Sequence, residues 1–247
     1  MVQSKISTGT RTHLLGYISI LICTALIVGF SIIACSSAEK PTAASVPSIS
    51  PAEAVQRCED AMAALDSFSF ELTHESGHTT LSGALELSKA GGLVAKNGLD
   101  LEAEATIGRA FVRVEAVVID EQTWMTNPLT GNWSEIPAEE SPFSFLDPVR
   151  LVADVLGSTQ NAVYPEAQPG NGVLQINGNI PTEALISVVG SIEPGAVTDV
   201  VLSLEPETYR LKKVVITGIA QPEDEPGTIR VIDLTDFNVE TTLEPPI

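Results

Sequence analysis

The sequence predicts an α+β domain with a large, mostly antiparallel sheet, and an export segment ahead of it. After residue 67, apolar and polar residues alternate with a period of two through most of the chain, which is typical of strands. One segment with helical spacing precedes the strands and two more fall between them without strict alternation, which favours helices gathered on one face of the sheet. An apolar run from Leu14 ends at Cys35.

The export segment has the form of a bacterial lipoprotein leader. Lys5 and Arg11 are basic, no acidic residue precedes Cys35, and Ile32-Ile33-Ala34-Cys35 fits the lipobox. An uncleaved membrane anchor is the alternative, because roughly 20 apolar residues suffice to span a bilayer. The Ala34-Cys35 boundary and the Ser/Ala/Pro-rich stretch after it favour the lipoprotein over that anchor and over a soluble secreted product. All three interpretations export the rest of the chain.

We therefore expect three regions: a signal peptide over 1-34, a lipidated cysteine with a flexible tether over 35-49, and a single domain over 50-247. Two or three acyl chains, such as palmitate, on Cys35 suffice for stable anchoring at the outer side of the membrane. The tether has an r.m.s. reach of roughly 20 Å.

The exported chain is strongly acidic. Without residues 1-34, 11 basic residues face 32 acidic ones, so the formal charge changes from −19 to −21. Such a surface is repelled by nucleic acid, and we expect no nucleic-acid partner. Cys58 is the one cysteine left after the leader is removed and Cys35 is acylated, so no disulfide framework is expected.

The first predicted helix begins after Ser50, where Ser50-Pro51-Ala52-Glu53 has the form of a capping box with proline at the first helical position. Its apolar stripe includes Cys58 and ends near Asp66. A lone thiol is a candidate redox or nucleophilic site, but we favour a buried cysteine acting as a small hydrophobe.

The strand pattern is clearest in 99–107, where Leu and Ala alternate with Asp and Glu. The other predicted strands cover residues 68–73, 81–88, 111–120, 122–126, 132–136, 172–177, 197–204, 210–218 and 228–239. Turn residues at 127–131 and 205–208 predict hairpins. Two more helices are predicted, from Asp147-Pro148 to Gly157 and from Pro181 to Val189.

The apolar faces of several strands carry small residues, namely Gly83, Ala103, Ala105 and Ala116, and the chain is only 5% aromatic. A strongly curved sheet with such side chains has difficulty filling its interior, which favours a hydrophobic cavity for a ligand. The alternative is a sheet that closes on its helices without a void. Residue patterns alone leave both interpretations open.

The layout resembles the LppX/LprAFG family of envelope lipoproteins. The matching features are the lipobox at Cys35, the tether, the segment from Leu65 to Phe70, the hairpin from Trp124 to Trp133, and the Asp147-Pro148 helix, followed by Gly178-Asn179-Ile180-Pro181 and the run from Val197 to Gly218.

The resemblance implies a half-barrel: a curved, mostly antiparallel sheet with helices on its concave side around a hydrophobic cavity that holds acyl chains of a lipid or glycolipid. It also implies lipid transport or presentation in the cell envelope, and leaves open whether a membrane transporter is a further partner. Cys35 carries over as the lipidation site. From the alternation, we expect the cavity to be lined by Leu101, Ala103, Val112, Val114, Val200 and Leu202.

An enzyme is the first rival interpretation. His74 and His78 are spaced to share a strand face as two metal ligands, but no third ligand group follows, and exposed residues are favoured there. The acidic runs Glu139-Glu140 and Glu223-Asp224-Glu225 lie in proline-bearing loops and are expected to be solvated. Nucleophile-elbow, phosphate-loop and dinucleotide motifs are missing, so we expect no catalysis, cofactor or metal.

A non-enzymatic scaffold or partner-binding lipoprotein with a filled core is the second rival. Trp124 and Trp133 could anchor a partner, although a cross-strand aromatic pair within one hairpin is favoured. The function predicted from the sequence is therefore a membrane-anchored lipid-binding lipoprotein, with the partner-binding lipoprotein as its alternative.

Overall fold

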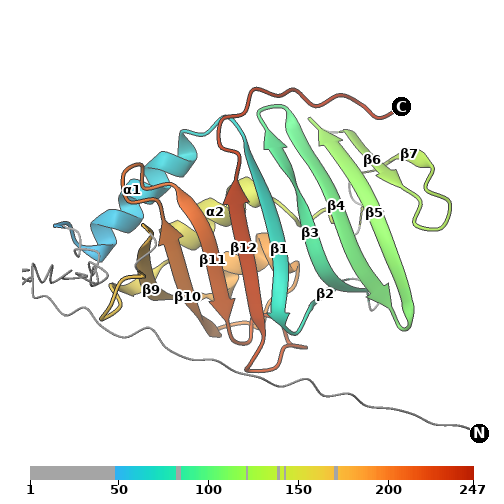
Figure 1. The fold of residues 1–247 in the computed structure, drawn as a ribbon. Helices are drawn as coiled ribbons and strands as arrows, with labels where there is room; N and C mark the ends of the chain where they lie inside the picture. Colours follow the sequence, from blue (N-terminus) through green and yellow to red (C-terminus); the bar gives the residue numbers. More distant parts are fainter. Residues whose placement is uncertain (1–47, 82–84, 121, 138–139, 142, 170–171) are drawn as a thin grey trace, which may run out of the picture. The chain divides into compact units, whose positions relative to one another are not determined.

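The computed structural model describes residues 48–81, 85–120, 122–137, 140–141, 143–169 and 172–247 (Figure 1). These residues all belong to one compact unit. Cys35, the leader, Gly83 and most of the predicted tether lie outside the described residues. Within the described part of the chain, no helix has the length and apolar character needed to cross a membrane.

A single 12-stranded sheet dominates this unit. Its strands are β1 (Phe68–Ser76), β2 (Thr79–Leu81), β3 (Leu85–Ala95), β4 (Gly98–Ile107), β5 (Ala110–Ile119), β6 (Gln122–Thr126), β7 (Trp133–Ile136), β8 (Gln160–Val163), β9 (Leu174–Pro181), β10 (Val197–Leu204), β11 (Leu211–Thr217) and β12 (Ile229–Thr235). They pair in the order β7-β6-β5-β4-β3-β1-β12-β11-β10-β9-β8, and β2 pairs with β3. The described pairs are antiparallel, as the sequence predicts.

The centre of the sheet is the pairing of the first strand with the last. Phe70 of β1 lies opposite Leu234 of β12 on one side and opposite Gly92 of β3 on the other. Apart from β1 and β3, the other neighbours are consecutive strands. The β1–β12 pair therefore joins two runs of consecutive strands, β3 to β7 and β8 to β12, into one curved sheet (Figure 1).

The helices are α1 (Pro51–Ala63), α2 (Pro148–Gly157), the short 3-10 turn η2 (Thr182–Leu185) and α3 (Ile186–Val189). The predicted caps are confirmed: Ser50 accepts a hydrogen bond from the backbone N–H of Glu53 at 3.2 Å, and Asp147 accepts one from that of Arg150 at 2.9 Å. Figure 1 shows α1 and α2 on the same face of the sheet, behind the strands, as an α+β half-barrel requires. We call this the inner face.

Cys58 lies on the buried side of α1 with no exposed surface, which confirms the packing interpretation. Burial raises the pKa of its thiol to about 12, with a smaller contribution from nearby Glu59. At neutral pH this thiol is protonated and unreactive.

Strand β2 begins at Thr79, ahead of the predicted strand 81–88, and two further strand segments were not predicted. The second half of β3, Lys89–Ala95, contains Gly91 and Gly92 and lacks alternation. Strand β8 is a short, largely exposed edge strand of mixed polarity. Tertiary pairing, with β1 and β4 for β3 and with β9 for β8, makes these segments strands despite weak local signals.

Candidate functional site

Small side chains cluster on the inner face of the half that contains β3 to β5. The register places Phe70, Gly92, Leu101, Ala116 and Met125 in one row across β1, β3, β4, β5 and β6. The neighbouring row continues from Leu72 through the small residues Ala90 and Ala103 to Val114. A row with this much glycine and alanine leaves space above the sheet that larger residues would fill.

A mainly apolar hollow lies over these strands, with a volume of about 670 Å³. Its floor includes Leu99, Leu101, Ala116 and Val118, and its other wall is the segment from Ser141 to Val149 that leads into α2. Pockets that hold small ligands have volumes of about 300–1,000 Å³, so this cavity is large enough for an apolar ligand.

Polar groups lie toward the solvent side of this cavity. Lys96, whose side chain is largely exposed, contributes to the wall and pairs with Asp66 at 2.9 Å between Nζ and Oδ1. Asp147 also contributes, but its carboxylate caps α2. The cavity can therefore enclose apolar chains while its rim keeps polar groups in water.

The interior beneath α2 is filled. The space between α2 and strands β1 and β12 amounts to about 10 Å³, too little for an alkyl chain. A separate groove of about 250 Å³ runs between α1 and α2, lined by apolar residues such as Met62 and Leu156. Open apolar space is thus located beside the helices and not under them.

A larger hollow of about 980 Å³ lies on the opposite, outer face of the sheet, but many of its lining residues are charged. Its lining includes the carboxylates Glu71, Asp100, Glu102, Glu104, Glu115 and Asp233. Covering these groups with hydrocarbon would desolvate several charges, so volume alone does not make this hollow a lipid site.

The six residues expected to line a cavity are separated by the fold. Leu101 lines the 670 Å³ cavity, and Ala103 and Val114 are buried in the next row of the same half-sheet. Val112 is half-buried against the same core. Val200 and Leu202 lie on β10, in the other half, where both are fully packed.

Sequence reasoning missed the segment that covers the cavity. Phe143 and Leu146 are buried and line it. The available signal was the largely apolar stretch 143–146 immediately before the Asp147-Pro148 helix start, which is too short to show a period and predicted no element.

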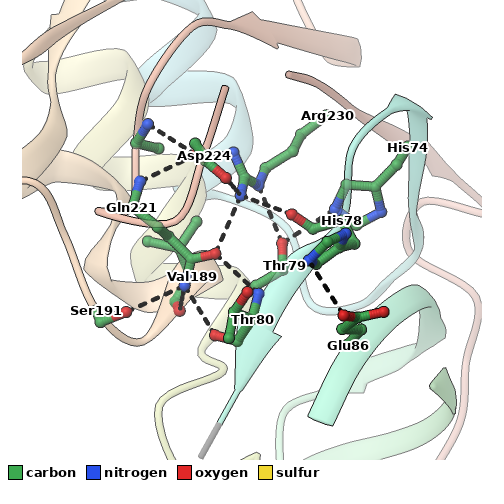
Figure 2. A network of polar contacts seen from close by, with 11 residues as sticks. His74, His78, Thr79, Thr80, Glu86, Val189, Ser191, Gln221, Asp224 and Arg230 are labelled. Atoms are coloured by element: carbon green, nitrogen blue, oxygen red, sulfur yellow. Dashed lines mark hydrogen bonds and ion pairs between the residues drawn. The ribbon is translucent and has the colours of Figure 1, made fainter. Parts of the chain in front are cut away.

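A buried polar network joins the two halves of the sheet near β2 (Figure 2). Arg230 of β12 has 0% of its surface exposed and binds both carboxylate oxygens of Asp224 at 2.8 Å. Its guanidinium also donates to Thr79 at 3.0 Å, to the His78 carbonyl at 3.1 Å and to Gln221 at 3.2 Å. The expectation that Asp224 is solvated is wrong, because its side chain is only 4% exposed.

The ion pair with Arg230 explains how the fold tolerates the buried carboxylate of Asp224. Burial by itself would raise the pKa of Asp224, but hydrogen bonds from Arg230 and from the backbone N–H groups of Gln221 and Ala220 outweigh it and hold that pKa below its usual range. Asp224 is therefore ionised at neutral pH.

Gln221 connects this ion pair to β2 and α3. Its side-chain amide nitrogen contacts the carbonyl oxygens of Thr80 at 2.9 Å and Val189 at 2.8 Å, and the hydroxyl of Ser191 at 3.1 Å. Its oxygen accepts from the Thr80 N–H at 2.9 Å. The network thus ties β2, α3 and β12 together.

The two histidines considered as metal ligands have different partners. His74 places Nδ1 3.0 Å from the Ser88 carbonyl oxygen and Nε2 3.0 Å from the Thr79 hydroxyl, an arrangement that a neutral ring with its proton on Nδ1 satisfies. His78 lies 3.9 Å from Glu86. In the part of the chain that the structure describes, no three potential metal ligands come together.

Trp124 and Trp133 are on the same hairpin, β6–β7, but are not directly opposite. Trp124 faces Glu135 and Trp133 faces Thr126, so the two rings are diagonal neighbours on one face. Trp124 is buried and Trp133 is half-buried.

Comparison with known proteins supports the arrangement of the fold. No curated protein matches the chain. Among solved structures, LprF from Mycobacterium bovis is similar with a TM-score of 0.59 and 16% identity, covering 79% of this chain and 96% of that one. LppX from Mycobacterium tuberculosis is similar with a TM-score of 0.54 and 15% identity, covering 78% and 98%. At these identities the similarity shows the shared fold.

The family is shown by the sequence itself. The sequence pattern of the LppX/LprAFG lipoproteins matches residues 50–238, which span the sheet, all the helices described above and the cavity. The chain therefore belongs to the LppX/LprAFG lipoprotein family.

Proposed function

We propose that this protein holds the acyl chains of a lipid or glycolipid in the 670 Å³ cavity and carries or presents that lipid in the cell envelope. The observation that carries the proposal is an apolar hollow on the inner face, where Leu101 of β4 and Ala116 of β5 lie opposite each other on its floor. Membership of a lipoprotein family supports a place in the envelope.

The physical basis is the cost of moving hydrocarbon through water. At about 0.8 kcal/mol per methylene, two 16-carbon chains lose on the order of 25 kcal/mol of favourable burial when they leave a bilayer. A dry cavity that replaces the bilayer removes most of this cost. The headgroup would stay at the wet rim near Lys96.

The direct experiment is mass spectrometry of organic extracts from the purified chain beginning at Ser36, which contains the whole described unit. We expect a co-purifying lipid. In the Ala116→Trp variant the indole would occupy the cavity floor, so the lipid should be lost while circular dichroism stays native. Ala110→Trp, at an exposed position, is the matched control and should keep the lipid.

The outcome also separates the rival function. A wild-type extract without lipid would favour the partner-binding lipoprotein, and lipid retained in the Ala116→Trp variant would place the ligand elsewhere. The groove between α1 and α2 would then be the next site to fill, with Ala153→Trp.

We also propose that acyl chains on Cys35 anchor the protein at the outer side of the cell membrane. The N-terminal peptide of the wild-type chain should begin at an acylated Cys35. Replacing Cys35 by alanine should abolish both the acylation and the cleavage that depends on the lipobox, so the variant's N-terminal peptide should keep the leader and carry no acyl groups. A wild-type chain that keeps its leader and carries no acyl groups would support an uncleaved anchor instead.

A further inference from the structure

We propose that the tip of the β4–β5 hairpin, residues Ile107 to Phe111, is a membrane-contact surface that inserts into the interface of an anionic bilayer. This surface is separate from the cavity, and its role does not require a lipid to be bound there. Three observations carry the inference: the shape of the hairpin, its exposed apolar side chains, and its local charge.

The hairpin is tight and projects as a narrow tip. Ile107 pairs with Ala110 at the end of the strands, so only Gly108 and Arg109 form the turn. Gly108 has a φ of +62° and Arg109 has no positive φ, the pattern of a two-residue turn with glycine in its first central position. In Figure 1 the β4–β5 connection forms the lower right end of the sheet.

Apolar side chains are exposed on both faces of this tip. Ile107 is 51% exposed and Phe111 is 61% exposed. The register pairs Phe111 with Thr106 and Ile107 with Ala110, so Phe111 and Ile107 point to opposite faces. If one face of the tip packed against a protein surface, the apolar side chain on the opposite face would remain in water. A tip that enters a bilayer interface buries both Ile107 and Phe111.

The local charge suits an anionic membrane, unlike that of the rest of the chain. Residues 105–114 contain two arginines and no acidic residue, although the exported chain carries a formal charge of −21. Arg113 is paired with Glu102 and Glu104 at 2.9 and 2.6 Å, but Arg109 at the tip has no carboxylate partner among the residues that the structure describes. A free arginine beside an aromatic ring is the combination favoured at bilayer interfaces.

Two other turns of the sheet have the opposite character. The β10–β11 turn carries Glu205 and Glu207, and the β5–β6 turn begins at Asp120. Anionic lipid repels these turns. Of these three turns, only the β4–β5 tip combines apolar exposure with positive charge, so an anionic bilayer would orient the domain with this tip toward it.

The test measures the depth of the tip while an artificial anchor holds the chain at the membrane. The chain from Ser36, with an N-terminal histidine tag, is captured on vesicles of phosphatidylcholine and phosphatidylglycerol that contain a nickel-chelating lipid. A polarity-sensitive fluorophore is attached at Ala110→Cys, which leaves Ile107, Arg109 and Phe111 in place. The buried thiol of Cys58 does not react under these conditions.

We expect lipids with brominated acyl chains to quench this label, and not the same label at Glu207→Cys on the β10–β11 turn. Adding Phe111→Ser should reduce the inserted fraction about tenfold. Arg109→Glu should reduce insertion with phosphatidylglycerol present and change little in phosphatidylcholine alone. Equal quenching at residues 110 and 207, or no quenching at 110, would overturn the proposal, and the second result would favour a protein partner for the tip.

Discussion

Both halves of the sheet are antiparallel, but they differ in how completely side chains fill the space over their inner faces. Strands β9 to β12 present large aliphatic residues such as Ile176, Leu202 and Ile216 to the inner face, and these are completely buried. Strands β3 to β5 present Gly92, Ala103 and Ala116 at comparable places, and the 670 Å³ cavity lies over this half. The comparison teaches that side-chain size along the rows, and not the course of the backbone, determines where this half-barrel is hollow.

The largest expected effect is at the network where the two halves meet. Arg230→Met leaves the buried Asp224 carboxylate without its partner, which should lower the free energy of unfolding by about 3–5 kcal/mol. Arg113→Met, which breaks exposed pairs on the outer face, is the control and should cost at most about 1 kcal/mol. Urea unfolding measures both, and equal losses would contradict the role of the buried pair.

Truncating one leucine in each half tests the difference in filling directly. Leu202→Ala should cost about 2–5 kcal/mol, because close packing leaves a new void. Leu99→Ala should cost less than half of that, since Leu99 is half-buried and already faces the cavity. If both variants unfold at the same urea concentration, the hollow half is as tightly packed as the filled one.

The position of Leu101 on the cavity floor depends on Gly92, which lies opposite it on β3. A Cβ atom there would lie 1.9 Å from the backbone oxygen of Asp100, so β3 and β4 must move apart to accept Gly92→Ala. We expect a loss of about 1–3 kcal/mol and a weaker lipid signal in mass spectrometry. Gly227→Ala, which meets no atom within 4 Å, should change neither.

The smallest expected effect is a pH dependence of stability at the buried polar network, where the two halves of the sheet meet. Burial lowers the pKa of His74, and nearby Arg230 lowers it further, against the hydrogen bond to Ser88 that raises it. The unfolded state then binds more protons than the native state below pH 6.5, so the free energy of unfolding should decrease as the pH falls from 7 toward 5. His74→Gln should flatten this dependence in thermal unfolding, and an unchanged slope in this variant would contradict the assignment to His74.

Much of the fold was accessible from the sequence because its signals are local. The alternation in 99–107 and the caps at Ser50 and Asp147 predicted elements that the structure confirms within a few residues. The pair Gly91-Gly92 concealed the second half of β3, because its strand conformation comes from pairing with β1 and β4.

The candidate site was accessible only in outline. Ala116 was recognised as a small residue on an apolar face and Leu101 as a lining residue, but Val200 and Leu202 have the same alternation and lie in the filled half. Asp224 looked like a solvated loop residue because its partner Arg230 belongs to a strand whose neighbours are set by the fold.

By itself the sequence determined most strands and helices, the acidic surface and the resemblance to a lipoprotein family, since each depends on residues close together in the chain. Only the tertiary structure decided which small residues lie side by side, where helices cover the sheet and which charges are buried. The pairing of β1 with β12 joins residues more than 150 positions apart, and no local pattern encodes the space that such a pairing encloses.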